Sequence, residues 1–135
     1  MSLLTWNESY SVGVQTLDRQ HVGLFNTLNE LHAAMLKGEA KNMTGPLLRK
    51  LLTYTKEHFA AEEALMASAK YPKLAEHIAQ HRDLTRQVND YVSRFERGEL
   101  TLSVHLLNFL RDWLTGHIQK TDRDYAPCLN DHGIR

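Results

Sequence analysis

Four long stretches of the chain each carry an apolar stripe at helical spacing, and this pattern constrains the fold more than any other feature of the sequence. The stretches are separated by the breaks KGEAKNMTG, SAKYP and RGELT. Pro46 and Pro72 suit the first turns of the second and third helices, while Thr44 and Thr101 are candidate N-caps. The predicted helices span about residues 17–37, 46–67, 72–96 and 102–124, after an irregular N-terminal arm at 1–16 with Trp6, Tyr10 and Val12 as anchors.

Helices of similar length joined by short connections favour an all-α fold, an antiparallel up-down-up-down four-helix bundle. The sequence has no strand pattern and no repeat at a fixed period. With 135 residues, the chain is long enough for one domain with its own core, so residues 1–135 are expected to form a single domain.

Charge and hydropathy argue against several classes of partner. The formal net charge is zero, which gives no indication of binding to nucleic acid or to an anionic membrane. No apolar run reaches the roughly 18 residues of a membrane span, and the N-terminus MSLLTWNESY lacks the features of a signal peptide. Together with a single cysteine, Cys128, these features predict a cytoplasmic protein.

Five of the eight histidines lie on the predicted inward stripes, and counting from the turns places them at one level of the bundle. In antiparallel neighbours, residues equally far from the connecting turn lie at the same height. From a turn near position 70, His58 and His81 are each 11 or 12 residues away. From turns near positions 40 and 99, His21 is level with His58, and His117 is level with His81. The inward histidines are His21, His58, His77, His81 and His117.

A layer of buried imidazoles needs partners, because leaving them unpaired or charged in a low dielectric is costly. A structural cluster is one explanation, but a metal site is favoured, since neutral imidazole is a common metal ligand. His58 and Glu62 share a helix face, as do His77 and His81, and the Glu62 carboxylate could bridge two ions. Glu63 points about 100° away and is not expected to be a ligand. This donor set exceeds the needs of one ion and suits iron, copper, zinc or manganese.

Four segments together resemble the hemerythrin family, specifically its bacterial single-domain forms, over nearly the whole chain. They are LDRQHVGLFNTLNEL (17–31), HFAAEEALM (58–66), HIAQH (77–81) and WLTGHIQKTDRDY (113–125). The resemblance implies a non-haem centre of two iron ions with a bridging oxo or hydroxo group. The implied ligands are His77, His81 and His117 for one iron, His21 and His58 for the other, which keeps an open position, and Glu62 and Asp122 as bridges.

By the same resemblance, the expected function is reversible binding of dioxygen for carriage, storage or delivery, by a cytoplasmic monomer that could supply an oxygen-consuming enzyme. An oxygen or redox sensor is one alternative, and a di-iron enzyme, such as a peroxidase or a nitric-oxide-handling protein, is another. Gln20, Gln80 and Thr121 are candidates for orienting the ligands. The expected oxygen pocket consists of Phe25, Phe59, Trp113, Leu114 and Ile118, for which plain core packing is the alternative reading.

The spacing between His117 and Asp122 conflicts with a regular helix. Residues five apart on an α-helix point about 140° away from each other. If both contribute to one site, as the resemblance implies, the last helix must be widened locally, as in a π-bulge, or bent near its end. Gly116, a poor helix former, lies just before His117 and makes such an irregularity plausible.

Overall fold

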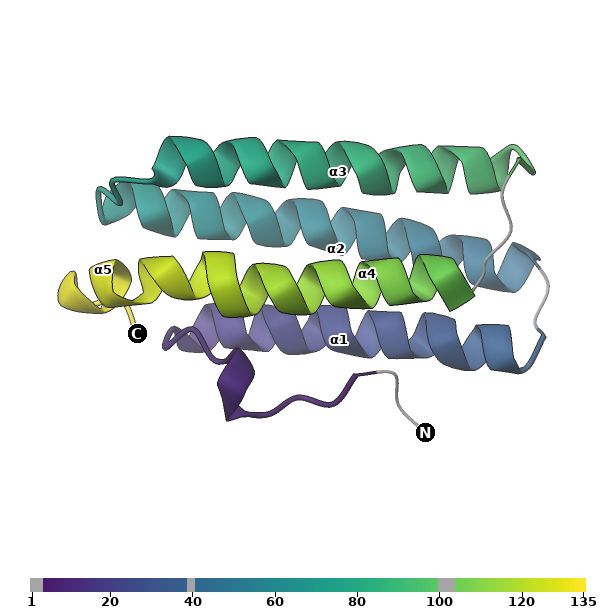
Figure 1. Ribbon diagram of the computed structural model, residues 1–135, viewed down its shortest axis with the longest axis horizontal. Helices are drawn as coiled ribbons and strands as arrows, with labels where there is room; N and C mark the ends of the chain where they lie inside the picture. The colour runs from purple at the N-terminus through teal and green to yellow at the C-terminus, as the bar shows by residue number, and fades with distance from the viewer. Residues whose placement is uncertain (1–3, 39–40, 100–103) are drawn as a thin grey trace.

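The computed structural model describes residues 4–38, 41–99 and 104–135 and shows four long helices packed side by side (Figure 1). None of the described residues forms a strand, and the predicted four-helix bundle is confirmed. The long helices are α1 (Gln15–Leu36), α2 (Lys41–Ser68), α3 (Leu74–Glu96) and α4 (Val104–Gly116). The shorter elements are the 3₁₀ turn η1 (Glu8–Tyr10), the π-helical segment η2 (His117–Thr121), the 3₁₀ turn η3 (Asp122–Tyr125) and the helix α5 (Ala126–Asp131).

The core is built from the apolar stripes that the sequence predicted. Along α1, Leu17, Leu24, Leu28 and Leu31 are each at most 1% exposed, because spacings of three, four and seven residues keep them on one face. Burying a leucine side chain stabilises the fold by roughly 1.5–3 kcal/mol. The stripes therefore hold the four helices together along their length and surround the histidine layer with apolar side chains.

The second helix begins earlier than the sequence predicted. α2 starts at Lys41, so Pro46 lies in its second turn and does not open the helix. Thr44 is buried inside the same helix, and the prediction that it is a cap is wrong. Pro46 is exposed and forfeits one backbone hydrogen bond, a cost that packing of the buried face of α2 outweighs. The candidate cap Thr101 and the predicted start of the last helix at 102 lie outside the described residues.

The turn between α2 and α3 sets the relative heights of the two helices. α2 ends in a turn where Lys70 has a left-handed backbone with φ of 56°, and the Tyr71 N–H donates to the Met66 carbonyl at 3.0 Å. α3 then begins at Leu74, two residues after the predicted start at Pro72. This short connection keeps the two helices antiparallel and in contact, so residues equally far from the turn face each other.

The N-terminal arm is tied to the first turn of α1 by one carboxylate. Asp18 accepts a hydrogen bond from the Ser11 hydroxyl at 2.6 Å and another from the Val12 N–H at 2.8 Å. Val12 is 1% exposed, which confirms it as an anchor of the arm. Gly13 follows with φ of 73°, and a side chain there would press against Asn130 of α5. The arm therefore packs against both the start of α1 and the end of the chain.

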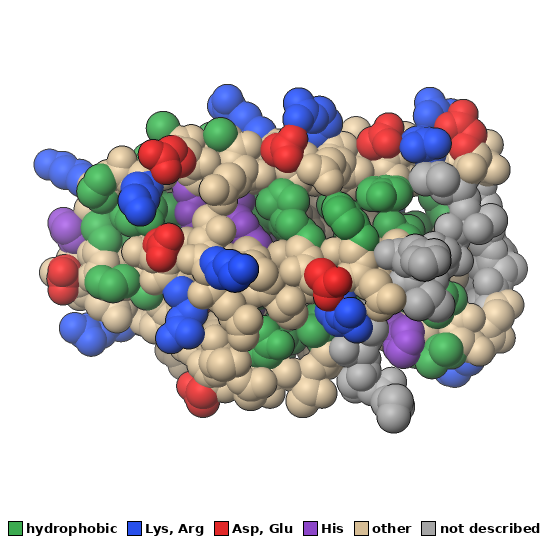
Figure 2. All heavy atoms as spheres, viewed as in Figure 1, with side chains coloured by type: hydrophobic (Ala, Val, Ile, Leu, Met, Phe, Trp, Pro, Cys, Tyr) green, Lys and Arg blue, Asp and Glu red, His purple; other side chains and the backbone are tan. Residues whose placement is uncertain are grey.

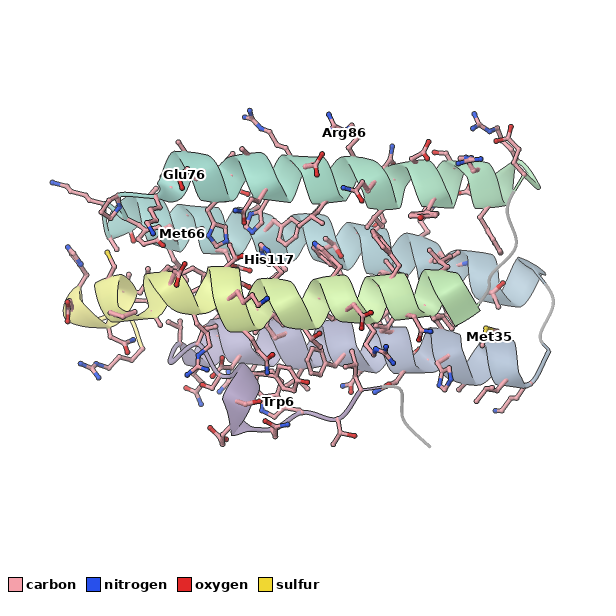
Figure 3. All side chains as sticks on the ribbon, in the orientation of Figure 1. Trp6, Met35, Met66, Glu76, Arg86 and His117 are labelled. Carbon is pink, nitrogen blue, oxygen red and sulfur yellow. The ribbon has the colours of Figure 1, made fainter. Side chains whose placement is uncertain are left out.

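Aromatic side chains attach the rest of the arm to α1. The Phe25 ring lies 5.6 Å from that of Trp6 and 4.9 Å from that of Tyr10, both edge-on, and Figure 3 shows Trp6 on the arm beside α1. The Asn29 amide pairs with the backbone of Leu4, accepting its N–H at 2.9 Å and donating to its carbonyl at 2.8 Å. The predicted anchors Trp6 and Tyr10 are confirmed, and the arm closes one side of the bundle.

Candidate metal centre

Seven histidine and carboxylate side chains converge in the interior of the bundle at one level. They come from α1, α2, α3 and the segments η2 and η3 that follow α4, and Figure 3 shows His117 beyond the middle of this last helix, towards α2 and α3. Histidine side chains are visible in the seam between α3 and α4, in the left half of Figure 2. All seven are at most 7% exposed: His21, His58, Glu62, His77, His81, His117 and Asp122.

Regular helix geometry places five of these side chains without distortion. His58 and Glu62 are four residues apart on α2, and His77 and His81 are four apart on α3, so each pair shares a face. His21 comes from the buried stripe of α1. The level predicted by counting from the turns therefore matches the structure.

The chain between His117 and Asp122 is widened, as the sequence predicted. Residues His117–Thr121 form a π-helical segment, and the Asp122 N–H donates to the carbonyls of His117 and Ile118. A bond to the carbonyl five residues back brings residues five apart close to one turn, so both side chains face inward. The Asp122 Oδ1 atom lies 3.0 Å from the His117 Nε2 atom. The distortion thus delivers a carboxylate that a straight α-helix would point away from the centre.

The predicted single helix at 102–124 is correspondingly wrong in detail. α4 ends at Gly116, and the π segment is followed by a 3₁₀ turn and then by α5, which continues to Asp131. Gly116 itself keeps an ordinary helical backbone, with φ of −63° and ψ of −42°. The irregularity therefore begins at His117 and is part of the site.

Each carboxylate faces histidines on two sides. One Glu62 oxygen contacts His58 and lies 3.6 Å from the Nε2 atom of His21, while the other lies 3.7 Å from the Nε2 atom of His77. Asp122 has the same arrangement: its Oδ2 atom is 3.2 Å from His21 Nε2, and its Oδ1 atom is 3.0 Å from His77 Nε2. Both carboxylates are therefore placed to bridge two neighbouring positions.

Two groups of donor atoms result, each with its atoms within 4.8 Å of one another. Asp122 belongs to both groups, and Glu62 lies between them. Within the part of the chain that the structure describes, these are the groups of at least three donors that could hold a metal ion: His21, His58, Glu62 and Asp122 in one, which we call the two-histidine group, and His77, His81, His117 and Asp122 in the other, the three-histidine group.

The donor atoms that face the centre fit a pair of cations. Among the described residues, both oxygens of Glu62 and of Asp122 have no hydrogen-bond partner, nor do the Nε2 atoms of His21, His58 and His77. The Nε2 atoms of His81 and His117 face each other at 3.2 Å. Buried polar atoms are almost always paired, because an unpaired one costs the full desolvation free energy. Two metal ions would satisfy all of these atoms together.

Two imidazoles are oriented from behind by unlike partners. The His58 Nδ1–H donates to the Gln20 amide oxygen at 2.5 Å, and the His81 Nδ1–H donates to the Glu63 carboxylate at 2.8 Å. Both bonds leave Nε2 free to face the centre, which is typical of metal-bound histidine. The sequence suggested Gln20 as a side chain that orients a ligand but missed Glu63 in this role. Glu63 points about 100° away from the layer, and this direction brings it to His81 of α3.

The two central carboxylates are held ionised by the histidines around them. Burial would raise the pKa of Glu62, but the charge of His58 and the contacts with His21 hold it well below its usual value. Burial and the charge of Glu62 would likewise raise the pKa of Asp122, and contacts with His117 and His21 lower it instead. The centre therefore carries two negative charges that positive neighbours must balance.

For three of the histidines, burial and contact with these carboxylates shift the pKa in opposite directions, and the outcomes differ. Burial alone would lower the pKa of His21 and of His77, but the carboxylates of Asp122 and Glu62 raise both to about 9. Burial dominates for His81 and lowers its pKa to about 3. In the metal-free chain, protons on His21 and His77 would balance the carboxylates, so a metal cation would compete with protons for the same place.

Aromatic rings cover two of the histidines. Phe59 stacks on His81 with ring centroids 3.7 Å apart and planes 2° from parallel. Trp113 stacks more loosely on His117, at 5.8 Å and 20°. These rings shield the outer faces of the three-histidine group from water and restrict rotation of both imidazoles.

A small apolar cavity lies beside the centre, in the middle of the bundle. Trp113 and Leu114 form part of its wall, and its volume of about 10 Å³ is close to the smallest that can hold one water molecule. Its other walls come from Leu24, Leu28, Leu51, Thr55, Val88 and Leu110. The other three residues expected around the oxygen pocket do not line this cavity: Phe25 contacts the arm, Phe59 stacks on His81, and Ile118 is fully buried in the π segment. An oxygen pocket formed by all five expected residues stays a prediction.

Tyr125 is a further buried group that the sequence did not single out. Its hydroxyl has no hydrogen-bond partner within the described residues, and its ring lies 5.7 Å from that of His77. Burial and the charges of Glu62 and Asp122 raise its pKa well above 10. Its place three residues after Asp122, on the same helical row, is the signal that could have identified it. Gln80, by contrast, is exposed, and Thr121 is half-buried.

Comparison with known proteins agrees with this geometry. The family model of the Hemerythrin HHE cation binding domain matches residues 12–129. The chain is 35% identical to the bacteriohemerythrin of Stenotrophomonas maltophilia, over 98% of this chain and 85% of that protein. It is 34% identical to the bacteriohemerythrin of Methylococcus capsulatus, over 96% and 99% of the two chains. It is also 32% identical to myohemerythrin-1 of Phascolopsis gouldii, over 92% of each.

Solved structures give the same result. The crystal structure of a wild-type hemerythrin superposes with a TM-score of 0.90 at 34% identity, covering 95% of this chain and 98% of that one. The chain therefore belongs to the hemerythrin family. No helix among the described residues is both long and apolar enough to cross a membrane.

Proposed function

We propose that this protein binds dioxygen reversibly at a non-haem di-iron centre, as a carrier, store or delivery protein in the cytoplasm. The observation that carries the proposal is the unequal division of five buried histidines, three and two, around two carboxylates that are placed to bridge. Membership of a family whose model is a cation-binding domain supports a metal at this place. The named bacteriohemerythrins and myohemerythrins support dioxygen as its ligand.

The proposed ligands follow from which atoms face each other. His77, His81 and His117 would hold one iron, and His21 and His58 would hold the other. Glu62 and Asp122 would each direct one oxygen to the first ion and one to the second. The first iron thus has one more imidazole than the second. With an oxo or hydroxo bridge between them, the iron of the two-histidine group keeps an open position for a small ligand.

When bound, the iron pair would supply electrons for reversible binding of dioxygen. The chain's own contribution is to restrict the site to small apolar ligands and to exclude water. Trp113 and Leu114 on the wall of the small cavity support this role, as does Phe59 over His81. We further propose that the protein acts as a monomer and releases its oxygen to an oxygen-consuming enzyme.

Reversibility tests the proposal. Protein loaded with Fe(II) under argon should develop visible absorption bands when air is admitted, and these should fade when argon returns, over several cycles. The same protein loaded with zinc should show no bands and serves as the control. Irreversible conversion to a ferric form at the first exposure would overturn the carrier role, and steady consumption of oxygen or peroxide would instead indicate an enzyme.

A further inference from the structure

A surface groove between α2 and α3 lies directly behind the three-histidine group. Its volume is about 500 Å³, within the range of pockets that hold small organic molecules. Arg86 marks its position in Figure 3, on the outer edge of α3 and turned away from α4. The groove is lined by Lys56, Phe59, Ala60, Glu63, His81, Arg82, Thr85, Arg86 and Asn89.

The rim of this groove carries a local excess of positive charge. Lys56, Arg82 and Arg86 are all exposed, although the whole chain has a formal net charge of zero. Within the described part of the chain, Lys56 and Arg82 form no ion pair, while Arg86 pairs with Asp83 on the same helix. Along the upper edge of the molecule over α3, Figure 2 shows Lys and Arg side chains interspersed with Asp and Glu side chains. Such a rim attracts anions and increases their rate of association.

The floor of the groove is the outer side of the candidate metal centre. Glu63, the one acidic residue among the described lining residues, accepts a hydrogen bond from His81, so three basic side chains face a single carboxylate in the groove. Phe59 lies flat on the His81 ring. A molecule in the groove would therefore be separated from the metal position of the three-histidine group by little more than the His81 imidazole and its partner.

We propose that this groove binds a small organic anion that donates electrons to the ferric form of the centre. The proposal rests on the proposed function, because a carrier that loses electrons to oxygen must be reduced before it can bind oxygen again. In each step, one electron leaves the donor and converts one Fe(III) to Fe(II), and a donor that carries protons on its reduced ring, as a reduced flavin does, releases them to water as it is oxidised. Two such steps, from one two-electron donor or two one-electron donors, restore the Fe(II) pair.

Reduced flavin mononucleotide and reduced riboflavin provide a matched pair of probes, since they share one redox-active ring and differ in a phosphate. Under argon, the ferric protein should be reduced faster by the phosphorylated flavin, on the order of tenfold at low salt. The advantage should shrink as salt is added, because screening weakens the attraction. A wild-type rate that is equal for the two flavins, or insensitive to salt, would overturn the proposal.

Variants then locate the effect. The double variant Lys56→Gln with Arg82→Gln should lose the advantage of the phosphorylated flavin while keeping its iron. Arg19→Gln is the matched control, because Arg19 is exposed and lies two residues from His21, at a different surface pocket. Arg19→Gln should behave like the wild type. Equal losses in both variants would show a general charge effect and contradict a binding site at this groove.

A binding measurement separates this proposal from the proposed function. Oxidised flavin mononucleotide, which cannot reduce iron, should bind the ferric protein more tightly than oxidised riboflavin, as followed by flavin fluorescence. The double variant should abolish that preference. If the absorption bands under air and argon fail to appear, the oxygen-binding function fails but this measurement still reports on the groove. A binding preference without a preference in reduction rate would overturn the electron-donor role.

Discussion

The two donor groups of the centre share Asp122 and lie on either side of Glu62, but they differ in the number of their histidines and in the side chains that support them. The two-histidine group is supported from behind by the neutral amide of Gln20, and the three-histidine group by the carboxylate of Glu63. A charged partner makes an imidazole a stronger donor than a neutral partner does. The three-histidine group therefore has more donor atoms and a charged supporting partner, while the two-histidine group has fewer donor atoms for its metal position.

The largest effect on metal binding is expected from removing a carboxylate that lies between the two groups. In Glu62→Ala, this carboxylate is lost, and His21, His58 and His77 each lose a neighbour. Metal affinity should fall by more than the roughly 10–100-fold that loss of an outer hydrogen-bond partner costs. Metal analysis after dialysis measures it. Glu57→Ala, an exposed acidic position on the same helix, is the control and should keep full metal content.

The outer partners test the difference between the groups. Glu63→Ala should weaken metal binding by roughly 10–100-fold, while Gln20→Ala should cost less, because its hydrogen bond to His58 is not charge-assisted. Titration with a competing chelator gives both affinities. Equal losses in the two variants would mean that the unlike partners do not make the groups unequal.

Protonation of the metal-free chain gives a third comparison. His21 and His77 have their pKa raised to about 9 from 6.5, so their contribution to stability is present below about pH 6.5 and is lost as the pH rises through 9. The free energy of unfolding of chelator-treated protein should fall by roughly 1–3 kcal/mol over that interval. Urea unfolding at several pH values measures it, and a stability that stays flat or rises would contradict the assignment.

His81 makes the metal-free protein less stable on the acid side of the same pH range. Its pKa is lowered to about 3 by burial, so the unfolded chain binds more protons below pH 6.5 and stability falls as the pH drops. The lowered pKa values of Glu62 and Asp122 add to this loss at lower pH, below their unfolded values of 4.5 and 3.8. Metal-free protein should therefore be most stable near pH 6.5, and bound metal should remove the alkaline loss by replacing the protons.

The smallest change is expected from shortening the π segment. Deleting the exposed Lys120 would bring His117 and Asp122 four residues apart, which a regular α-helix accommodates on one face. Metal content should then stay within about twofold of the wild type. An alanine inserted at the same place should abolish binding of at least one ion. Loss of metal in the deletion variant would show that the widened turn does more than rotate Asp122.

Sequence reasoning succeeded where a simple period determines position. The heptad-like stripe of α1 and the four-residue pairs on α2 and α3 predicted both the bundle and the histidine layer, because 3.6 residues per turn leave few alternatives. The resemblance made Asp122 a candidate ligand, and its five-residue spacing from His117 then predicted a widened or bent helix, of which the structure shows the widened form. A spacing of ligand residues that does not fit the α-helical period can thus indicate a local distortion of the helix at a functional site.

Other features depend on neighbours that a single sequence does not place. The helix start at Lys41 was missed because Pro46 suits a first helical turn, whereas in the structure Pro46 lies in the second turn and Thr44 is buried within the helix. The helix period placed Glu63 about 100° from the layer but could not place α3 beside it, so its bond to His81 was missed. The buried hydroxyl of Tyr125 was missed because its neighbours, such as the His77 ring, come from another helix.

The central claim is that seven side chains form one site with two unequal metal positions. Titration of chelator-treated protein with Fe(II) under argon, followed by near-infrared magnetic circular dichroism, tests it most directly, because ligand-field bands distinguish five-coordinate from six-coordinate Fe(II). The account predicts two irons per chain, with one signal of each kind. One iron per chain, or two irons with the same six-coordinate signal, would contradict it.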